Sequence, residues 1–350
     1  MPRRTRQTTT SSRKQQHVQL TLTRDVGFRL KTTGLERVEF VHNALPEIDL
    51  AEVDTACSFL ERRLRLPLLI TGMTGGYREA LSINRTLAEV AQSMGIAMGL
   101  GSQRQALESE DYHRTFSIVR QVAPEIPVIG NLGAAEVARL RDASPVQRLA
   151  ELAGADAFAV HLNPLQELLQ KEGTPAFRGV LGGIEKLVRG LSIPVIVKEI
   201  GAGISADVAR RVAEVGVRII DVAGAGGTSW AGVEILRRRP AHRSESFWDW
   251  GIPTAEAVRA VVALARERGD LTVIASGGII SGMDAAKCLA LGASLAGTAR
   301  PALLALQRGG KRALVRMLEG WRDELRAVMF LTGSRSLDEL RNVPLVRRDG

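Results

Sequence analysis

The segment His161–Glu167 (HLNPLQE) holds an imidazole, two amides and a carboxylate within seven residues. A buried core histidine would explain His161 alone, and an acid in the first turn of a helix would explain Glu167 alone. Neither explains the whole cluster, which therefore indicates a functional site. One carboxylate beside amides suits Mg²⁺, which takes water and phosphate oxygens as its other ligands, whereas zinc would need His and Cys. We predict that Glu167 binds a magnesium ion.

Three more polar side chains close short apolar runs elsewhere. Lys198 lies in Pro194–Glu199, and a buried amine there must meet an anion or a developing negative charge, or form a Schiff base. Arg104 follows Gly95–Leu100, and its guanidinium suits an anionic oxygen, although an arginine that caps the rim of a barrel would look the same. Asn131 can both donate to and accept from the edge of a planar ring. All three are candidates for ligand contacts.

Glycine-rich segments follow several of the runs. They are Thr71–Gly76 (TGMTGG), Asp221–Trp230 (DVAGAGGTSW) and Ser276–Gly282 (SGGIISG), and the last run leads into Thr298–Pro301 (TARP). Glycine lets a ligand approach the backbone closely. The loops after the seventh and eighth strands of a (β/α)8 barrel commonly form a phosphate cup beside a helix N-terminus. The last two segments therefore predict a phosphate site.

The elements that carry these residues repeat along the chain. The eight apolar runs are Leu68–Thr71, Gly95–Leu100, Pro127–Asn131, Ala157–His161, Pro194–Glu199, Arg218–Ala223, Thr272–Ser276 and Ser294–Thr298. Most lack polar alternation, which is typical of parallel strands buried on both faces, and helical spacing fills most intervals. This pattern predicts the α/β class, as a (β/α)8 TIM barrel with an N-terminal extension. Since such barrels place their chemistry at the C-terminal ends of the strands, we expect an enzyme.

Four parts are predicted along the chain. Residues 1–12 form a basic tail expected to be disordered, and residues 13–65 form the N-terminal extension. Residues 66–306 form the barrel, and residues 307–350 form an amphipathic helix (Lys311–Leu331) and a tail. The longest interval between runs lies between the sixth and the seventh and contains Trp230 and Phe247–Pro253. Long loops of this kind often act as lids or binding elements.

Composition narrows the function. The net charge of +9 could indicate nucleic-acid binding, but arginine spread over exposed helices explains it, and 4% aromatic residues are too few for base stacking. Cys57 and Cys288 lack metal-ligand spacing, so we expect a reducing compartment and no disulfide. No apolar run approaches the ~20 residues of a membrane helix. We expect a cytoplasmic protein without membrane or nucleic-acid partners, with a transit-like N-terminal peptide as the alternative.

Taken together, these residues resemble the FMN-dependent type 2 isopentenyl diphosphate isomerases. The resemblance spans about Arg13 to Pro301, and His161–Glu167 is its most specific part. The other matching segments are Arg13-Lys14 with His17, Leu35-Glu36, Val41–Pro46, Met73–Gly76, Gly101–Arg104, Gly130–Gly133, Val197–Glu199, Gly226–Trp230, Asp249–Thr254 and Ser276–Gly278. Gln15-Gln16 departs from the family, which often has an acidic residue before the histidine.

The resemblance implies an isomerase of isoprenoid biosynthesis that interconverts isopentenyl and dimethylallyl diphosphate by a 1,3-allylic proton shift. FMN, reduced by NADPH or NADH, would act as acid and base, and Mg²⁺ would bind the diphosphate. It also implies a homo-oligomer, a tetramer or octamer, whose N-terminal extension contributes to the substrate site.

The resemblance also implies roles for individual residues. The FMN contacts would be Gly72, Met73, Thr74, Ser102, Asn131, Lys198, Thr228, Gly278, Ile279, Ile280, Ala299 and Arg300. The substrate contacts would be Arg13, Lys14, Ser102, Gln103, Arg104 and Gln166. Gln166, Lys198 and His161 would be catalytic, and Glu167 would hold the metal.

Three other functions fit part of the sequence. A flavin barrel that oxidises 2-hydroxy acids would need a His base and paired Arg at the seventh strand, where Ser276–Gly278 offers neither. A nucleotide dehydrogenase would need a nucleophilic cysteine in a loop, and neither Cys57 nor Cys288 ends a strand. A non-enzymatic barrel that binds flavin, phosphate or RNA would explain the charge of +9 but would leave His161–Glu167 without a role.

Overall fold

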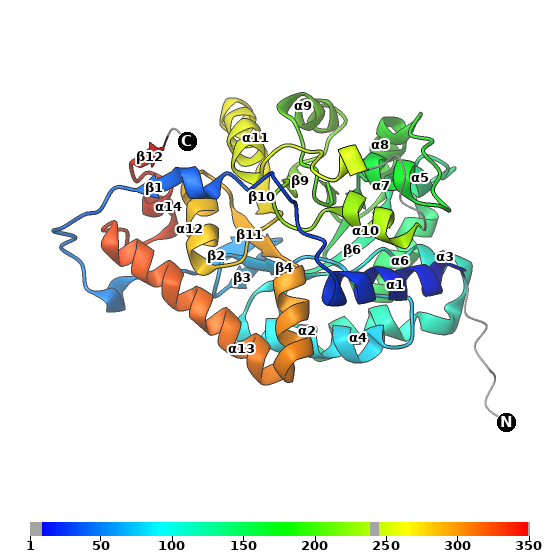
Figure 1. Cartoon of the computed structure of the whole chain (residues 1–350), viewed down its shortest axis with the longest axis horizontal. Helices are drawn as coiled ribbons and strands as arrows, with labels where there is room; N and C mark the ends of the chain where they lie inside the picture. The colour runs from blue at the N-terminus through cyan, green and yellow to red at the C-terminus, as the bar shows by residue number, and fades with distance from the viewer. Residues whose placement is uncertain (1–8, 239–244, 349–350) are drawn as a thin grey trace.

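Eight parallel strands form a closed barrel at the centre of the molecule (Figure 1). The computed structural model describes residues 9–238 and 245–348, and each predicted apolar run coincides with one barrel strand. The strands are β4 (Leu68–Ile70), β5 (Ala97–Gly99), β6 (Val128–Gly133), β7 (Ala157–His161), β8 (Val195–Lys198), β9 (Ile219–Asp221), β10 (Thr272–Ser276) and β11 (Leu295–Thr298). They follow sequence order around the barrel, and β11 closes it by pairing with β4. The predicted (β/α)8 fold is confirmed.

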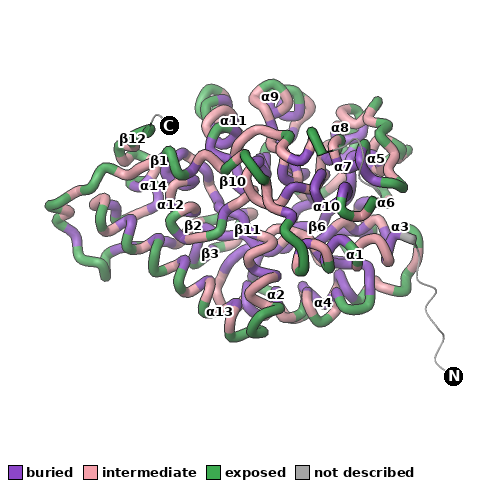
Figure 2. The backbone as a smooth tube through the Cα atoms, in the orientation of Figure 1, coloured by how far each residue is buried: buried purple, intermediate pink, exposed green. Residues whose placement is uncertain are grey.

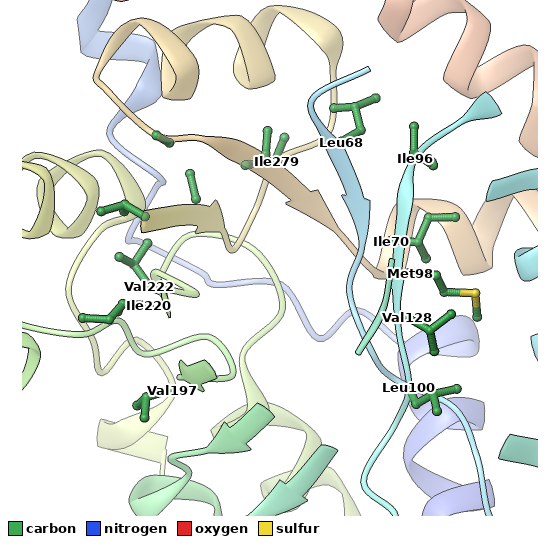
Figure 3. Packing of buried hydrophobic residues seen from close by; sticks show 14 of the residues in the cluster. Leu68, Ile70, Ile96, Met98, Leu100, Val128, Val197, Ile220, Val222 and Ile279 are labelled. Carbon is green, nitrogen blue, oxygen red and sulfur yellow. The ribbon is translucent and has the colours of Figure 1, made fainter. Parts of the chain in front are cut away.

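Successive residues of each strand enter two different hydrophobic clusters. Leu69 of β4 and Ile274 of β10 belong to a small cluster inside the barrel. Their neighbours Leu68 and Val273 belong to the larger cluster between the strands and the helices, part of which is drawn in Figure 3. Because both faces of the strands are buried, the apolar runs carry no polar alternation.

Helices surround the barrel, and buried residues concentrate at its centre (Figure 2). Those that follow the barrel strands are α2 (Ala80–Met94), α3 (Arg104–Glu108), α4 (Arg114–Val122), α5 (Ala134–Val137), α6 (Ser144–Ala153), α7 (Pro164–Leu169), α8 (Val180–Gly190), α9 (Ala206–Glu214), α10 (Trp230–Arg237), α11 (Thr254–Arg268), α12 (Gly282–Ala290) and α13 (Arg300–Leu331). Serine side chains cap three of them: Ser205, Ser229 and Ser281 each accept a backbone N–H from the first turn of α9, α10 and α12.

The N-terminal helix α1 (Thr9–Thr23) contacts α3, α10 and α13, on the side of the barrel where the strands end (Figure 1). The predicted disorder is wrong for residues 9–12, which are helical. Thr10 and Ser11 are buried, and the Thr10 hydroxyl donates to Glu108 at 3.0 Å, so tertiary contacts order this polar turn. Residues 1–8 of the predicted tail lie outside the described residues.

The rest of the extension covers two other parts of the barrel. Strand β1 (Val38–Phe40) pairs antiparallel with β12 (Leu345–Arg347), next to α14 (Leu337–Leu340), so this part of the N-terminal extension lies against the C-terminal part of the chain (Figure 1). The hairpin of β2 (Cys57–Phe59) and β3 (Arg62–Leu64) adds Phe59 and Leu64 to the inner cluster. Because β3 leads directly into β4, this hairpin closes the end of the barrel opposite to the strand C-termini.

The long interval between β9 and β10 holds the N-terminal extension. The Asp249 carboxylate accepts the backbone N–H groups of Arg29, Leu30 and Lys31 at 2.8, 3.1 and 3.2 Å. Trp248 donates its indole N–H to the Gly27 carbonyl at 2.8 Å. Hydrogen bonds from this interval therefore fix residues 27–31 of the extension near the C-terminal ends of the barrel strands.

Helix α13 crosses the predicted boundary at 306/307 without a break. Gly309 and Gly310 have non-helical backbone angles, and the amphipathic helix predicted over Lys311–Leu331 is the part of α13 beyond this kink. It buries Leu314, Leu318 and Trp321. The boundary therefore falls about one turn before a kink that separates two helical segments of α13.

Phe158 of β7 gives a stability test of the outer core. Its ring is fully buried and packs against Gly130 of the neighbouring strand β6. We expect Phe158→Ala to lower the free energy of unfolding by about 3–5 kcal/mol because it leaves a cavity, whereas Phe158→Leu should lose less than about 1.5 kcal/mol. Urea unfolding followed by circular dichroism measures both. Equal stability of Phe158→Ala and the wild type would contradict this account.

Candidate active site

Two adjoining cavities lie at the C-terminal ends of the strands. The first, the glycine cavity, measures about 310 Å³ and is lined by the loops that follow β9, β10 and β11. The second, the charged cavity, measures about 110 Å³ and lies under α1. Both linings include Gly72, Met73, Lys198, Ile200 and Trp230. The two cavities therefore share one wall.

Glycines bring the loops of the glycine cavity close together. A Cβ on Gly227 would lie 2.4 Å from the backbone nitrogen of Gly278, so only glycine lets these two loops meet. Gly277 and Gly278 have φ angles of +98° and +70°, which glycine adopts without strain. The first residues of α13 also line the cavity, and a helix N-terminus favours anions. The backbone here fits the phosphate of a flavin nucleotide.

The charged cavity brings four cationic side chains and two carboxylates together. Arg13 and Lys14 come from α1, Arg104 from α3 and Lys198 from the end of β8, while the carboxylates are Glu136 and Glu167. Arg104 lies 2.7 Å from Glu136 and 3.2 Å from Glu108. Positive charge exceeds negative charge in this cavity, so it suits a polyanion.

Burial and neighbouring cations disfavour the charged forms of the two α1 residues. Burial, followed by the charge of Arg13, lowers the pKa of Lys14 to about 7. Burial, followed by the charge of Arg104, also lowers the pKa of Arg13. The Lys14 ammonium donates to the carbonyls of Gly75, at 3.2 Å, and Ser102. An anion in the cavity would relieve this repulsion.

Gln166 of α7 has a fixed side-chain amide. Asn163 donates to its Oε1 at 3.1 Å, and its own Nε2 donates to Glu234 of α10 at 3.1 Å. The amide is buried, and its residue lines the charged cavity. Gln166 is thus held in one orientation at the wall of the site.

The buried carboxylate of Glu234 contacts several side chains at once, and the sequence did not predict this role. Its carboxylate lies 2.8 Å from His17 Nε2 and 2.6 Å from Arg237 Nη1, and Gln170 Nε2 lies 3.3 Å away. Burial acts to raise the pKa of Glu234, but the hydrogen bond from His17 and the charges of His17 and Arg237 outweigh it, so the pKa is lowered. An isolated glutamate within a helix carries no signal of such a role in the sequence.

Lys198 and His161 lie side by side at paired positions of β8 and β7. Lys198 Nζ lies 3.7 Å from the Asp221 carboxylate, whose pKa is raised by burial against the opposing charge of Lys198. His161 Nδ1 lies 2.8 Å from Asn131 Oδ1. Burial, then the charges of Lys198 and Lys14, lowers the pKa of His161 to about 3, so its imidazole is neutral near pH 7.

The oxygen atoms around Glu167 supply some, but not all, of the ligands that one hard cation needs. Its two carboxylate oxygens accept from Asn163 Nδ2 at 3.2 Å and from the Thr174 N–H at 2.7 Å. Asn163 Oδ1 is buried without a hydrogen-bond partner and is a further oxygen in the same cavity lining. Across residues 9–238 and 245–348, no group of three His, Cys, Asp or Glu side chains could hold a metal ion. A Mg²⁺ ion at Glu167 would therefore take most of its ligands from water and a bound anion.

Most predicted site residues line the two cavities. The glycine cavity includes Gly72, Met73, Lys198, Thr228, Gly278, Ile279, Ile280, Ala299 and Arg300. The charged cavity includes Arg13, Lys14, Ser102, Arg104, Asn131, His161, Gln166, Glu167 and Lys198. Asn131, Gln166 and Lys198, which come from three distant parts of the sequence, thus face one compartment.

Two predicted contacts, Thr74 and Gln103, line neither cavity. The buried Gln103 amide donates to the Leu149 carbonyl at 2.8 Å and accepts the Asn131 N–H at 3.1 Å, so it supports Asn131 instead of facing a substrate. The Thr74 hydroxyl donates to the buried side chain of Asn84. Both side chains are consumed by internal hydrogen bonds, which sequence spacing does not reveal.

Arg300 links the glycine cavity to α1. Its Nε donates to the Thr21 carbonyl at 2.8 Å and its Nη2 donates to the Arg24 carbonyl at 3.1 Å. The side chain therefore caps the C-terminal end of α1, while the backbone of the same residue begins α13 at the glycine cavity.

None of the helices in the described part of the chain is long and apolar enough to cross a membrane.

Comparison with known proteins identifies the relatives of this chain. The family model described as FMN-dependent dehydrogenase matches residues 148–347. Proteins named isopentenyl-diphosphate delta-isomerase are 46% identical in Chlorobaculum parvum, covering 97% of this chain and 98% of that protein, and 44% identical in Methanothermobacter thermautotrophicus, covering 96% and 93%.

Solved structures with the same fold include two kinds of oxidase. A mandelate oxidase variant that carries an FMN adduct is 23% identical, with a TM-score of 0.66, over 91% of this chain and 90% of that one. A lactate oxidase from Pediococcus acidilactici is 15% identical, with a TM-score of 0.67, over 93% and 89%. These two share the barrel fold. Since the family model covers more than half of the chain and the named relatives align over nearly all of it, the chain belongs to the FMN-dependent dehydrogenase family and, within it, to the type 2 isopentenyl-diphosphate delta-isomerases.

Proposed function

We propose that this protein interconverts isopentenyl diphosphate and dimethylallyl diphosphate by a 1,3-allylic proton shift. The observation that carries the proposal is the shared wall of the two cavities, where Lys198, Met73 and Trp230 face both the glycine cavity and the charged cavity. This geometry suits a ring system and a diphosphate ester bound side by side. The names of its relatives support the same substrate pair.

The charged cavity would bind the diphosphate. Arg13, Lys14 and Arg104 supply the cations, and Glu167 would hold Mg²⁺ against the diphosphate oxygens. Binding energy from the diphosphate then orients the small hydrocarbon, which offers no polar group of its own. The hydrocarbon would lie toward Met73 and Trp230, which exclude water from the reacting carbons.

Reduced FMN bound in the glycine cavity would supply an acid and base at N5, a role for which ordinary side chains are poorly suited when the substrate is an alkene. The chain's own residues hold the reacting geometry. Lys198 provides positive charge beside the ring site, and neutral His161 is oriented by Asn131. Gln166 presents an amide whose Nε2 donates to ionised Glu234, so its oxygen and nitrogen keep their places.

Further parts of the proposal rest on the family resemblance. The reductant would be NADPH or NADH, and the metal would be Mg²⁺ at Glu167. We also propose a homo-oligomer, a tetramer or octamer, in the cytoplasm. Of the predicted site residues, Thr74 and Gln103 would act by supporting neighbouring backbone and side chains rather than by touching FMN or substrate.

Oxidation of a 2-hydroxy acid is the competing function, because the structural neighbours include mandelate and lactate oxidases. An oxidase would need a histidine base at the end of the seventh strand. Here Ser276 occupies that end and donates its hydroxyl to Asp221 at 2.5 Å. The site therefore favours the isomerase.

The decisive assay follows isopentenyl diphosphate in the presence of FMN, NADPH and Mg²⁺ without oxygen. We expect dimethylallyl diphosphate to form, with deuterium incorporation from D₂O. Gln166→Ala should keep the flavin spectrum, because Gln166 does not line the glycine cavity, but should lose about 10²–10⁴-fold in turnover. Leu168→Ala, on the exposed side of the same helix, is the matched control and should behave as wild type. Absence of turnover by the wild type would refute the function.

The charge of Lys198 should tune the bound flavin. Removing it in Lys198→Met withdraws a cation from the ring site and disfavours the anionic reduced flavin. We expect the two-electron potential of bound FMN to fall by about 30 mV or more, while Lys198→Arg stays close to wild type. Spectroelectrochemical titration measures this shift. An unchanged potential in Lys198→Met would remove the proposed role.

Lys14 should make diphosphate binding depend on pH. Because its pKa without ligand is about 7, the amine loses its proton above that pH, and an anion must bind together with a proton. The affinity for an unreactive alkyl diphosphate should therefore fall by up to about tenfold per unit as the pH rises above 7. Lys14→Arg keeps its charge across this pH range. Dividing the dissociation constant of the wild type by that of Lys14→Arg at each pH therefore removes the effect of ligand ionisation, which is the same for both proteins. A ratio that is the same from pH 6 to pH 9 would contradict this assignment.

A further inference from the structure

Two more spaces lie behind the charged cavity in the direction of the molecular surface. A small cavity of about 10 Å³, the bridge cavity, has room for about one water molecule. An apolar groove of about 820 Å³, the outer groove, lies beyond it. Its lining includes Leu168, Phe247 and Trp250. The outer groove is much larger than either cavity of the active site.

Shared linings join these spaces in series. Gln166, Ile200 and Trp230 line both the charged cavity and the bridge cavity. Leu165 and Trp250 line both the bridge cavity and the outer groove. A single layer of side chains therefore separates the charged cavity from the bridge cavity. We call Ile200 and Trp230 the inner wall.

Ile200 is held in the inner wall by its own turn. The buried Glu199 carboxylate accepts the backbone N–H groups of Ile200 and Gly201, both at 2.6 Å, and of Ala202 at 2.5 Å. A Cβ on Gly201 would lie 2.9 Å from the Thr228 carbonyl and 3.6 Å from Trp230 Cδ1. The turn that carries Ile200 is thus rigid and packs closely against the segment that carries Trp230.

Trp230 is held from the other side. Ser229 caps α10 by accepting the Gly232 N–H at 2.9 Å, and its hydroxyl donates to the Trp248 carbonyl at 2.6 Å. The ring of His17 meets the Trp230 indole edge to face, with centroids 5.4 Å apart. Both halves of the inner wall are therefore fixed before any ligand binds.

We propose that Ile200 and Trp230 limit the chain length of the prenyl diphosphate that the active site accepts. This inference rests on the proposed function. With the diphosphate at Arg13, Lys14 and Arg104, a five-carbon chain ends at the inner wall. A ten-carbon chain would have to pass through it, toward the bridge cavity and the apolar outer groove. Smaller side chains at the inner wall open that path.

The chemistry on the longer chain is the same proton shift. Geranyl diphosphate, the ten-carbon probe, would lose a proton from the methyl group on C3 and gain one at C2, which gives its 3-methylidene isomer. No oxidant or further reactant is consumed. In D₂O the reverse step places deuterium in geranyl diphosphate, so exchange reports the reaction even where the equilibrium favours the starting compound.

The experiment compares kcat/KM for exchange into geranyl diphosphate with kcat/KM for isopentenyl diphosphate, using the FMN-loaded, reduced protein. We expect the wild type to give a low ratio and Ile200→Ala to raise it at least about tenfold, with Ile200→Val between them. Trp230→Leu should raise the ratio independently. Leu168→Ala lines the outer groove but not the inner wall, so it should leave the ratio unchanged.

The outcomes separate this inference from the proposed function. A wild type that turns over both diphosphates equally, or wall variants that keep the wild-type ratio, would overturn the chain-length limit. If the wild type fails on isopentenyl diphosphate, the proposed function fails instead. The role of the inner wall is then tested by binding measurements. Ile200→Ala and Trp230→Leu should bind geranyl diphosphate more tightly, relative to isopentenyl diphosphate, than the wild type does. This comparison also holds for a variant that has lost turnover. Equal relative affinities in wild type and both variants would refute it.

Discussion

Burial of the adjacent cations Arg13 and Lys14, with further positive charge close by, is the constraint on which the site depends. Burial and like charge lower the pKa of both groups, so the folded chain holds them under electrostatic stress. Helix α1 keeps them in place because it is anchored at both ends. Thr10 bonds to Glu108 near its start, and Arg300 caps its last carbonyls. A polyanion relieves the stress, so the anchoring of α1 is part of ligand recognition.

The same helix also reaches the reaction centre. His17, one turn after Arg13, contacts Glu234, and Glu234 accepts from Gln166. The orientation of the Gln166 amide therefore depends on the position of α1 as well as on its own helix. A displacement of α1 would remove cations from the charged cavity and at the same time free the amide. Binding of the diphosphate and positioning at the hydrocarbon are coupled through one rigid element.

The barrel and much of the site were predictable because their signals are local. Buried parallel strands are continuous apolar runs, and polar residues at their ends, such as Asn131 and Lys198, must meet at one rim. Hydrogen bonds between segments far apart in the sequence leave no local pattern from which they could be predicted. Glu234 meets Gln166 across 68 positions, and the Gln103 amide turns to the Leu149 backbone. The polar residues 9–12 are ordered by burial against other helices, which composition does not reveal.

The end of β8 and the turn that follows it carry both a cation of the active site and a residue of the inner wall. Lys198 faces both cavities, Glu199 binds three successive backbone N–H groups, and Ile200 forms the inner wall. Burial raises the pKa of Glu199 to about 6, which its three backbone donors and Lys198 oppose. Protonation of this carboxylate would weaken the three hydrogen bonds that fix Ile200. The cation beside the ring site and the proposed limit on chain length therefore lie two residues apart, on either side of Glu199.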